Sequence, residues 1–221
     1  MGYAEYLNNF IKDADFGEPI LTSEIADNLA REFAIDIGKA KKTANVYLKR
    51  FADRGDLTRA RRGVYGKNKA SVFGRIAPDN TKMLTEFFIK DKNDKIGYLA
   101  GPALLNTLGI STQVPAKQTI ATNRYRYKIN PDAAIEIKRP IIKVTNENAK
   151  YLQAIEAVKA MKKYPIDAEN PAALMQFAFR NMEIDVATLM RYANDYCDDR
   201  ELREIIDIVF REAGQNELTQ G

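Results

Sequence analysis

The sequence contains no histidine and a single cysteine, Cys197. Without histidine, the usual zinc sites, the Ser–His and Cys–His nucleophile pairs and imidazole acid–base catalysis all lose their common residue. One cysteine cannot form an internal disulfide, which fits a reducing cytoplasm. We expect Cys197 to be unreactive, because the acidic run Asp195–Asp199 around it should raise its thiol pKa. Long apolar runs are also missing, so we expect a cytoplasmic protein with no membrane partner.

Motifs of catalysis are equally scarce. The acidic residues are scattered or lie beside arginine, as in Asp198–Glu201. The segment Gly97–Gly101 lacks the Gly-Lys-Ser/Thr end of a phosphate-binding loop. We therefore expect a protein that is not an enzyme and that has no catalytic residues, no cofactor and no metal site.

Positive charge, by contrast, is concentrated in one segment. Asp36–Lys69 holds eleven Lys or Arg residues against three Asp, a local net charge of +8. The preceding residues 1–35 are acidic, so the basic character is not shared by the whole chain. Charge localised in this way is typical of a surface that binds a polyanion.

The first part of this segment has the period of an amphipathic helix. Its apolar stripe comprises Ile37, Ala40, Ala44, Leu48 and Phe51. At about 100° per residue, a cationic face lies opposite this stripe. A short basic hairpin follows, with strands Leu57–Arg59 and Val64–Gly66 and with Arg61, Arg62 and Gly63 at its tip.

A cationic helix followed by a basic hairpin is what a winged helix-turn-helix presents to DNA. We expect the helix to enter the major groove while the hairpin reaches neighbouring phosphates. The predicted DNA-binding residues are Lys39, Lys42, Thr43, Asn45, Lys49, Arg50, Arg59, Arg61 and Arg62. Two other interpretations remain open, a solvated helix face and a protein-interaction module. The one-signed charge and its continuation from helix to hairpin favour DNA.

The charge of the whole chain, +4 over 221 residues, divides into three blocks, and we expect three domains with the same bounds. Residues 1–69 carry +3 and form the predicted winged helix-turn-helix domain. Residues 70–145 carry +6 and form an α+β domain, and residues 146–221 carry −5 and form a helical C-terminal region. The predicted fold class is therefore α+β.

The α+β block should contain a small antiparallel sheet. Alternating residues predict strands at Thr119–Thr122, Tyr125–Ile129 and Ile135–Lys138, after a short extended piece at Tyr98–Leu99. The second of these strands would place Arg124, Arg126 and Lys128 on one face. That face is either a solvated outer surface or a second contact with DNA.

The helical block contains clear start signals. Asn170-Pro171 is a cap followed by a first-turn proline, and further helices are expected to begin at Asp185 and Asp198. A preceding helix is expected over Glu147–Lys162, with Leu152, Ile155 and Val158 inward.

The middle of the chain resembles a known family. The segment Leu108–Pro115 reads Leu-Gly-Ile-Ser-Thr-Gln-Val-Pro, and Ile120–Asn123 follows it with Ile-Ala-Thr-Asn. These residues resemble the Leu-Gly-Leu-Thr-Thr-Gln-Val-Pro and Ala-Thr-Asn motifs of the AbiEi-type antitoxins of type IV toxin–antitoxin, or abortive-infection, systems. The likeness covers most of Phe73–Ile129 closely and the winged helix in outline, and it is weak in the tail.

The resemblance implies a bifunctional protein. Its winged helix would bind repeats in the operon promoter as double-stranded DNA and repress transcription, and its C-terminal region would counter a cognate toxin of nucleotidyltransferase type. Two readings from other classes stay open. One is a plain transcriptional regulator whose helical tail dimerises or binds a co-regulator, and the other is an interaction adaptor without a DNA role.

Overall fold

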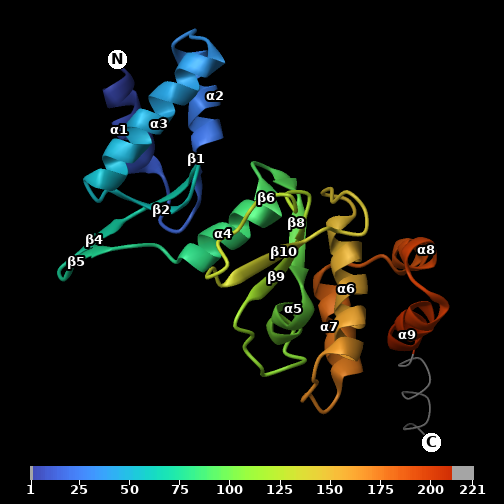
Figure 1. The fold of residues 1–221 in the computed structure, drawn as a ribbon. Helices are drawn as coiled ribbons and strands as arrows, with labels where there is room; N and C mark the ends of the chain where they lie inside the picture. Colours follow the sequence, from blue (N-terminus) through green and yellow to red (C-terminus); the bar gives the residue numbers. More distant parts are fainter. Residues whose placement is uncertain (1, 211–221) are drawn as a thin grey trace, which may run out of the picture. The chain divides into compact units, whose positions relative to one another are not determined.

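The computed structural model describes residues 2–210, and the chain forms two compact units, Met1–Phe87 and Phe88–Gly221 (Figure 1). Both units combine helices with small sheets, so the α+β class is confirmed. The units differ from the three blocks expected from charge. Residues 70–87 belong to the first unit, and residues 88–145 share the second unit with the helical tail.

The first unit begins with three helices and short strands. The elements are α1 (Tyr3–Asp13), β1 (Ile20–Leu21), α2 (Thr22–Glu32), α3 (Ile37–Asp53), β2 (Leu57–Arg61), β3 (Val64–Lys67), β4 (Lys69–Ser71), β5 (Gly74–Ile76) and α4 (Asn80–Ile89), which continues into the second unit. Strands β1, β3 and β2 pair antiparallel in that order, and β4 pairs with β5 in a separate hairpin.

The predicted stripe of α3 forms much of the core of this unit. Ala40, Ala44, Leu48 and Phe51 are buried against apolar residues of α1 and α2, whereas Ile37, the first residue of α3, is exposed. Strand β3 also packs closely against α4. A Cβ atom added at Gly66 would lie 2.1 Å from the sulfur of Met83 in α4. This close approach explains why residues 70–87 belong to the first unit.

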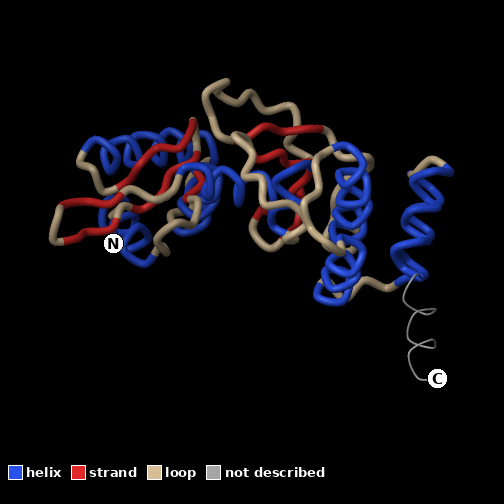
Figure 2. Tube along the Cα trace, turned by 90° about the horizontal axis from the view of Figure 1, so that it is seen from below, coloured by secondary structure: helices blue, strands red, loops and turns tan. Residues whose placement is uncertain are grey.

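The second unit combines a three-stranded sheet with helices (Figure 2, strands in red). After α4 come β6 (Lys90–Asp91), β7 (Asp94–Lys95), β8 (Gly97–Ala100), α5 (Gly101–Thr107), β9 (Gln118–Thr122), β10 (Ile135–Lys138), α6 (Ala149–Lys163), α7 (Pro171–Asn181), α8 (Val186–Tyr196) and α9 (Asp199–Phe210). Asn170 and Asp185 cap α7 and α8 as predicted, each accepting a hydrogen bond from a backbone N–H group.

The sheet is mixed, so the expected antiparallel sheet was wrong in part. Strand β8 pairs antiparallel with β9, but β10 pairs parallel with β9, with Ile135 opposite Gln118. The chain of residues 123–134 returns to the beginning of β9, and β10 therefore runs in the same direction.

The strand expected at Tyr125–Ile129 was also wrong, because the backbone closes turns there. The N–H group of Tyr125 donates to the carbonyl oxygen of Thr122 at 3.1 Å, and that of Tyr127 donates to Arg124 at 3.0 Å. A segment with its N–H groups in local turns cannot use them in a ladder. The alternation of Arg124, Arg126 and Lys128 therefore does not define a strand face.

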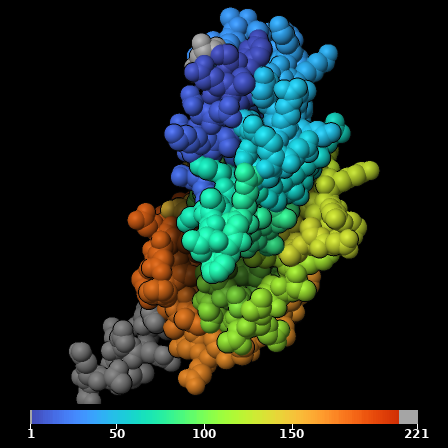
Figure 3. Space-filling model, turned by 90° about the vertical axis from the view of Figure 1, so that its left-hand side faces the viewer, coloured from blue at the N-terminus to red at the C-terminus, as the bar shows by residue number. Residues whose placement is uncertain are grey.

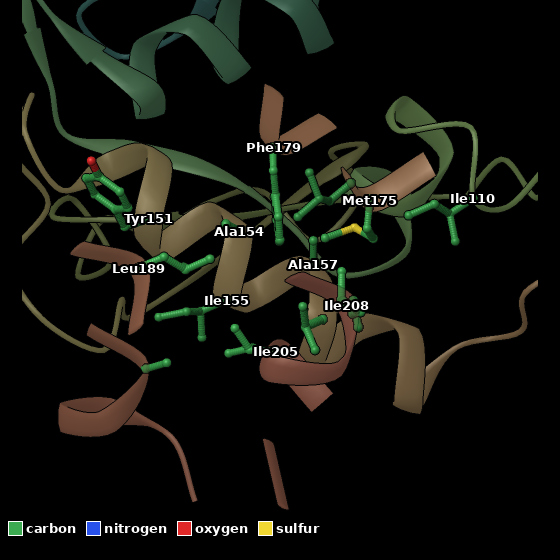
Figure 4. Close-up of a cluster of buried hydrophobic side chains, with 14 of the residues drawn as sticks. Ile110, Tyr151, Ala154, Ile155, Ala157, Met175, Phe179, Leu189, Ile205 and Ile208 are labelled. Atoms are coloured by element: carbon green, nitrogen blue, oxygen red, sulfur yellow. The ribbon is translucent and has the colours of Figure 1, made fainter. Parts of the chain in front are cut away.

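Helix α6 joins the sheet and the tail into one unit. Ala149 and Leu152 pack with Tyr98 and Ala100 of β8, while Ile155 and other residues of α6 pack against α7, α8 and α9. Figure 4 shows this second cluster, to which Met175, Phe179, Leu189, Ile205 and Ile208 contribute from the last three helices. Because α6 is buried on more than one side, the helical tail does not form a separate core.

Candidate nucleic-acid interface

The start of α3 is defined by a side-chain cap. The carboxylate of Asp36 accepts hydrogen bonds from the backbone N–H groups of Gly38 and Lys39, at 2.7 and 3.2 Å. Such a cap satisfies N–H groups that have no partner within the helix. The cap fixes where α3 begins, and the stripe buried against α1 and α2 determines which face of α3 points to solvent.

The outward face of α3 carries most of the predicted DNA-binding residues. Lys39, Lys42, Lys49 and Arg50 are exposed, and Thr43 is half-buried. Lys42 and Lys49 are two turns apart, which separates their Cα atoms by about 10 Å along the helix axis. The guanidinium carbon of Arg50 lies 5.4 Å from the centroid of the Tyr47 ring. The structure therefore brings these cations onto one side of one helix.

Two uncharged residues lie within the cationic face. Val46 is 48% exposed although it is apolar. Asn45 is exposed, and its side-chain amide donates to the carbonyl oxygen of Lys41 at 2.9 Å. Methyl groups and amides are used by proteins to contact thymine methyls and base edges, so both residue types suit a groove-facing helix.

The hairpin of β2 and β3 follows α3 and carries the other predicted cations. Arg59 and Arg62 are exposed, and Gly63 at the turn has φ +83°, a conformation that L-residues with a side chain rarely adopt. The carbonyl oxygen of Gly63 accepts a hydrogen bond from the N–H of Thr22 at 3.0 Å. The turn is therefore held against the start of α2.

Arg61 was predicted to lie at the tip of the hairpin, but its position is different. It belongs to strand β2, next to a register shift between Arg59 and Arg61. Its guanidinium carbon lies 5.3 Å from the ring centroid of Phe87, and its Nη1 atom is shielded from solvent. The side chain of Arg61 thus lies over Phe87 within the first unit, apart from the exposed cations of the hairpin.

The acidic residue that follows α3 is paired with arginines. Asp56 forms ion pairs with Arg54 at 2.9 Å and with Arg75 at 3.3 Å. Arg75 also donates to the backbone carbonyl of Arg54, which ties β5 to the end of α3. The negative charge of Asp56 is therefore neutralised locally, and the segment Leu57–Pro78 that follows carries only positive charges.

The basic segment predicted from the sequence ended at Lys69, and the second hairpin, β4–β5, was not predicted. Residues 57–78 contain six Lys or Arg and no Asp or Glu. The two apolar residues at the tip of this hairpin, Val72 and Phe73, are almost completely exposed. A sequence signal was present, because Ser71 and Gly74 flank Val72-Phe73 as turn residues commonly do.

Two of the basic residues at 124–128 make contacts within the second unit. Arg124 is largely buried and forms an ion pair with Asp91 at 3.1 Å. Arg126 and Arg139 each lie 5.6 Å from the ring centroid of Tyr125. The contacts of Arg124 with Asp91 and of Arg139 with Tyr125 connect the turn to neighbouring segments of the second unit.

The loop of the Leu108–Pro115 motif is held by Asp167. The carboxylate of Asp167 accepts hydrogen bonds from the N–H of Thr112, at 2.9 and 3.1 Å, and from its hydroxyl. The hydrogen bond from the Thr112 side chain is the largest influence that lowers the pKa of Asp167. The pKa of the Cys197 thiol is raised mainly by burial. Glu201 and Asp198 raise it further, whereas Lys159 and Lys162 lower it.

Two features are absent from residues 2–210, the part of the chain that the structure describes. Within this range no helix is long and apolar enough to cross a membrane. The same residues include no group of three or more Cys, Asp or Glu side chains placed to hold a metal ion.

Comparison with known families places the chain in one of them. The sequence model of the "Family of unknown function (DUF6088)" matches residues 28–177, and the protein belongs to this family. The match begins within α2 and ends within α7, so it includes α3, both hairpins of the first unit and the sheet of the second. No curated protein matches the chain.

Proposed function

We propose that the first unit is a winged helix-turn-helix that binds double-stranded DNA. Helix α3 serves as the recognition helix in the major groove, and the β2–β3 hairpin serves as the wing. The observation that carries this proposal is the exposed cationic face of α3, which lies opposite a buried stripe and next to a segment without acidic residues.

The arrangement of elements supports the same reading. A short strand, β1, precedes α2 and pairs with β3, so the hairpin and the helices share one core. The major groove is about 12 Å wide and accepts an α-helix. A surface helix with Lys42 and Lys49 on one side, and with Thr43 and Val46 between them, can combine phosphate and base contacts.

The wider role rests on the resemblance of Phe73–Ile129 to the AbiEi-type antitoxins. We propose that the protein represses its own operon by binding promoter repeats, and that its C-terminal region counters a cognate nucleotidyltransferase-type toxin. In this proposal DNA binding and toxin neutralisation use different surfaces of the chain. A plain transcriptional regulator would have the first activity and lack the second.

DNA binding is tested with short duplexes that tile the DNA upstream of the reading frame. Lys42→Glu/Lys49→Glu should abolish binding measured by fluorescence anisotropy, and circular dichroism should show that the variant remains folded, because both side chains are exposed. Arg200→Glu/Arg203→Glu on α9 is the matched control, because it makes the same change in charge at exposed positions of the second unit. Full affinity in the Lys42/Lys49 variant would refute the assignment of α3.

The antitoxin role is tested by co-expression with the neighbouring gene, which the proposal expects to encode a nucleotidyltransferase-like protein. The full-length chain should restore growth of cells that express the toxin. The Lys42→Glu/Lys49→Glu variant should restore growth equally well while failing to repress a promoter reporter. If the unaltered protein represses the reporter but never restores growth, the plain-regulator reading replaces the antitoxin reading.

A further inference from the structure

The β4–β5 hairpin ends in two apolar side chains that contact little of the protein. Val72 is 93% exposed and Phe73 is 99% exposed. Figure 1 shows β4 and β5 extending away from α1, α2 and α3, and Figure 3 shows the tip, coloured blue-green, at the molecular surface. Single exposed apolar residues are common, but a phenylalanine and a valine together at a projecting tip call for an explanation.

The tip has a defined shape. The hydroxyl of Ser71 donates to the carbonyl oxygen of Gly74 at 2.8 Å and accepts a hydrogen bond from the N–H of Phe73 at 3.2 Å. Gly74 has φ +110°, which closes the turn between paired Ser71 and Gly74. Because an isolated two-stranded hairpin is only marginally stable, this local bonding helps to keep the two apolar side chains in place.

The base of the hairpin is attached to the end of the recognition helix. Arg75 pairs with Asp56 and donates to the backbone of Arg54, the residue after α3. The side chain of Asn68 donates to the carbonyl oxygen of Gly55 at 2.9 Å and accepts from the hydroxyl of Thr58 at 2.7 Å. The tip is therefore coupled to α3 through short polar contacts, and it would be positioned when α3 binds.

The charge around the tip selects a polyanion as its partner. Leu57–Pro78 contains six cations and no acidic residue, and Lys69 at the start of β4 is exposed. In a symmetric contact, a second copy of this chain would bring the same positive segment to the tip and would be repelled. Apolar wedges on cationic ribbons are used by minor-groove proteins, which insert them between base pairs and bend the duplex.

We infer that Val72 and Phe73 form an apolar wedge that inserts into a base step in the minor groove of the DNA bound by α3. This inference rests on the proposed DNA binding and adds a second reading element to it. Minor-groove bending depends on how easily a base step unstacks, so the wedge would select flexible pyrimidine–purine steps at a fixed distance from the major-groove site.

The test uses the full chain with Val72→Ser/Phe73→Ser on upstream duplexes that carry a donor and an acceptor dye at their ends. The unaltered protein should bend the duplex, and the variant should bend it much less and bind about tenfold more weakly. The slope of affinity against salt should stay the same, because no phosphate contact is removed. Phe73→Met should keep most of the bend, since methionine is also a wedge residue.

The matched control is Val114→Ser/Phe177→Ser, which removes the same two side-chain types from exposed positions of the second unit. This control should bind and bend DNA normally. If the unaltered protein binds DNA and the tip variant bends it equally, the wedge is refuted and the proposed function stands. If the unaltered protein binds no duplex, both are refuted. A tip variant that loses self-association in sedimentation velocity, with DNA bending unchanged, would assign the tip to a second copy and overturn the wedge.

Discussion

Replacing Arg61 and Arg62 separately by alanine should change two different properties, although the residues are neighbours. Arg62 is exposed at the β2–β3 turn, so Arg62→Ala should remove one phosphate contact. The slope of log affinity against log salt should then become shallower by about 0.9. The side chain of Arg61 lies over Phe87, with Nη1 shielded from solvent. Arg61→Ala should leave the slope unchanged.

The cost of Arg61→Ala should appear in stability instead. A cation–π contact that is partly shielded from water contributes about 1–2 kcal/mol, and the aliphatic stem adds packing. The free energy of unfolding in urea should therefore fall by about 2 kcal/mol for Arg61→Ala and by less than about 0.5 kcal/mol for Arg62→Ala. Anisotropy titrations at several salt concentrations measure the slope. Arg203→Ala on α9 is the control for both measurements. A shallower slope with full stability in Arg61→Ala would show that Arg61 reaches the DNA and would refute this reasoning.

Two further substitutions test the second unit. Gly97→Ala should lower its free energy of unfolding by about 3 kcal/mol, because the new Cβ would lie 2.4 Å from the carbonyl oxygen of Phe88 and 2.8 Å from that of Ala121. Gly2→Ala, in the first unit, is the control and should have little effect, because a Cβ there meets nothing within 4 Å. Equal melting temperatures of the two variants would contradict the close approach at Gly97. Asp167, Asp185 and Asp198 accept hydrogen bonds chiefly from Thr112, Thr188 and Glu201, and these bonds lower the pKa of each carboxyl from its usual value. A carboxyl whose pKa is lower in the folded than in the unfolded protein stabilises the fold at pH values above the unfolded pKa, and this stability is lost as the pH falls through the folded pKa. The melting temperature should therefore decrease on acidification. It should decrease less in the triple Asp→Asn variant, which lacks these carboxyls.

Local sequence patterns predicted most of the elements. The stripe from Ala40 to Phe51 repeats at the helical period, and Asn170 and Asp185 are residues whose side chains cap helices. These features depend on neighbours within a few residues, so they can be read without knowing the fold. The exposed cations of α3 followed from the same geometry, because a buried stripe fixes the opposite face.

Patterns that depend on distant partners were predicted less well. Tyr125–Ile129 alternates like a strand, but Arg124 pairs with Asp91 and the side chain of Asn123 bonds to the backbone of Val144, which favours a turn. The direction of β10 was missed for a related reason. Alternation within a strand carries no information about whether its neighbour runs parallel or antiparallel.

By itself, the sequence determined the class of surface: a one-signed, cationic helix face followed by a basic hairpin, in a chain without histidine. The tertiary structure decided which cations remain available, since Arg61 lies over Phe87 and Arg75 pairs with Asp56. It also left Val72 and Phe73 outside the core, although their apolar side chains by themselves would suggest burial. The physical reason is that charge and periodicity are local properties, whereas burial and pairing depend on which distant segments the fold brings together.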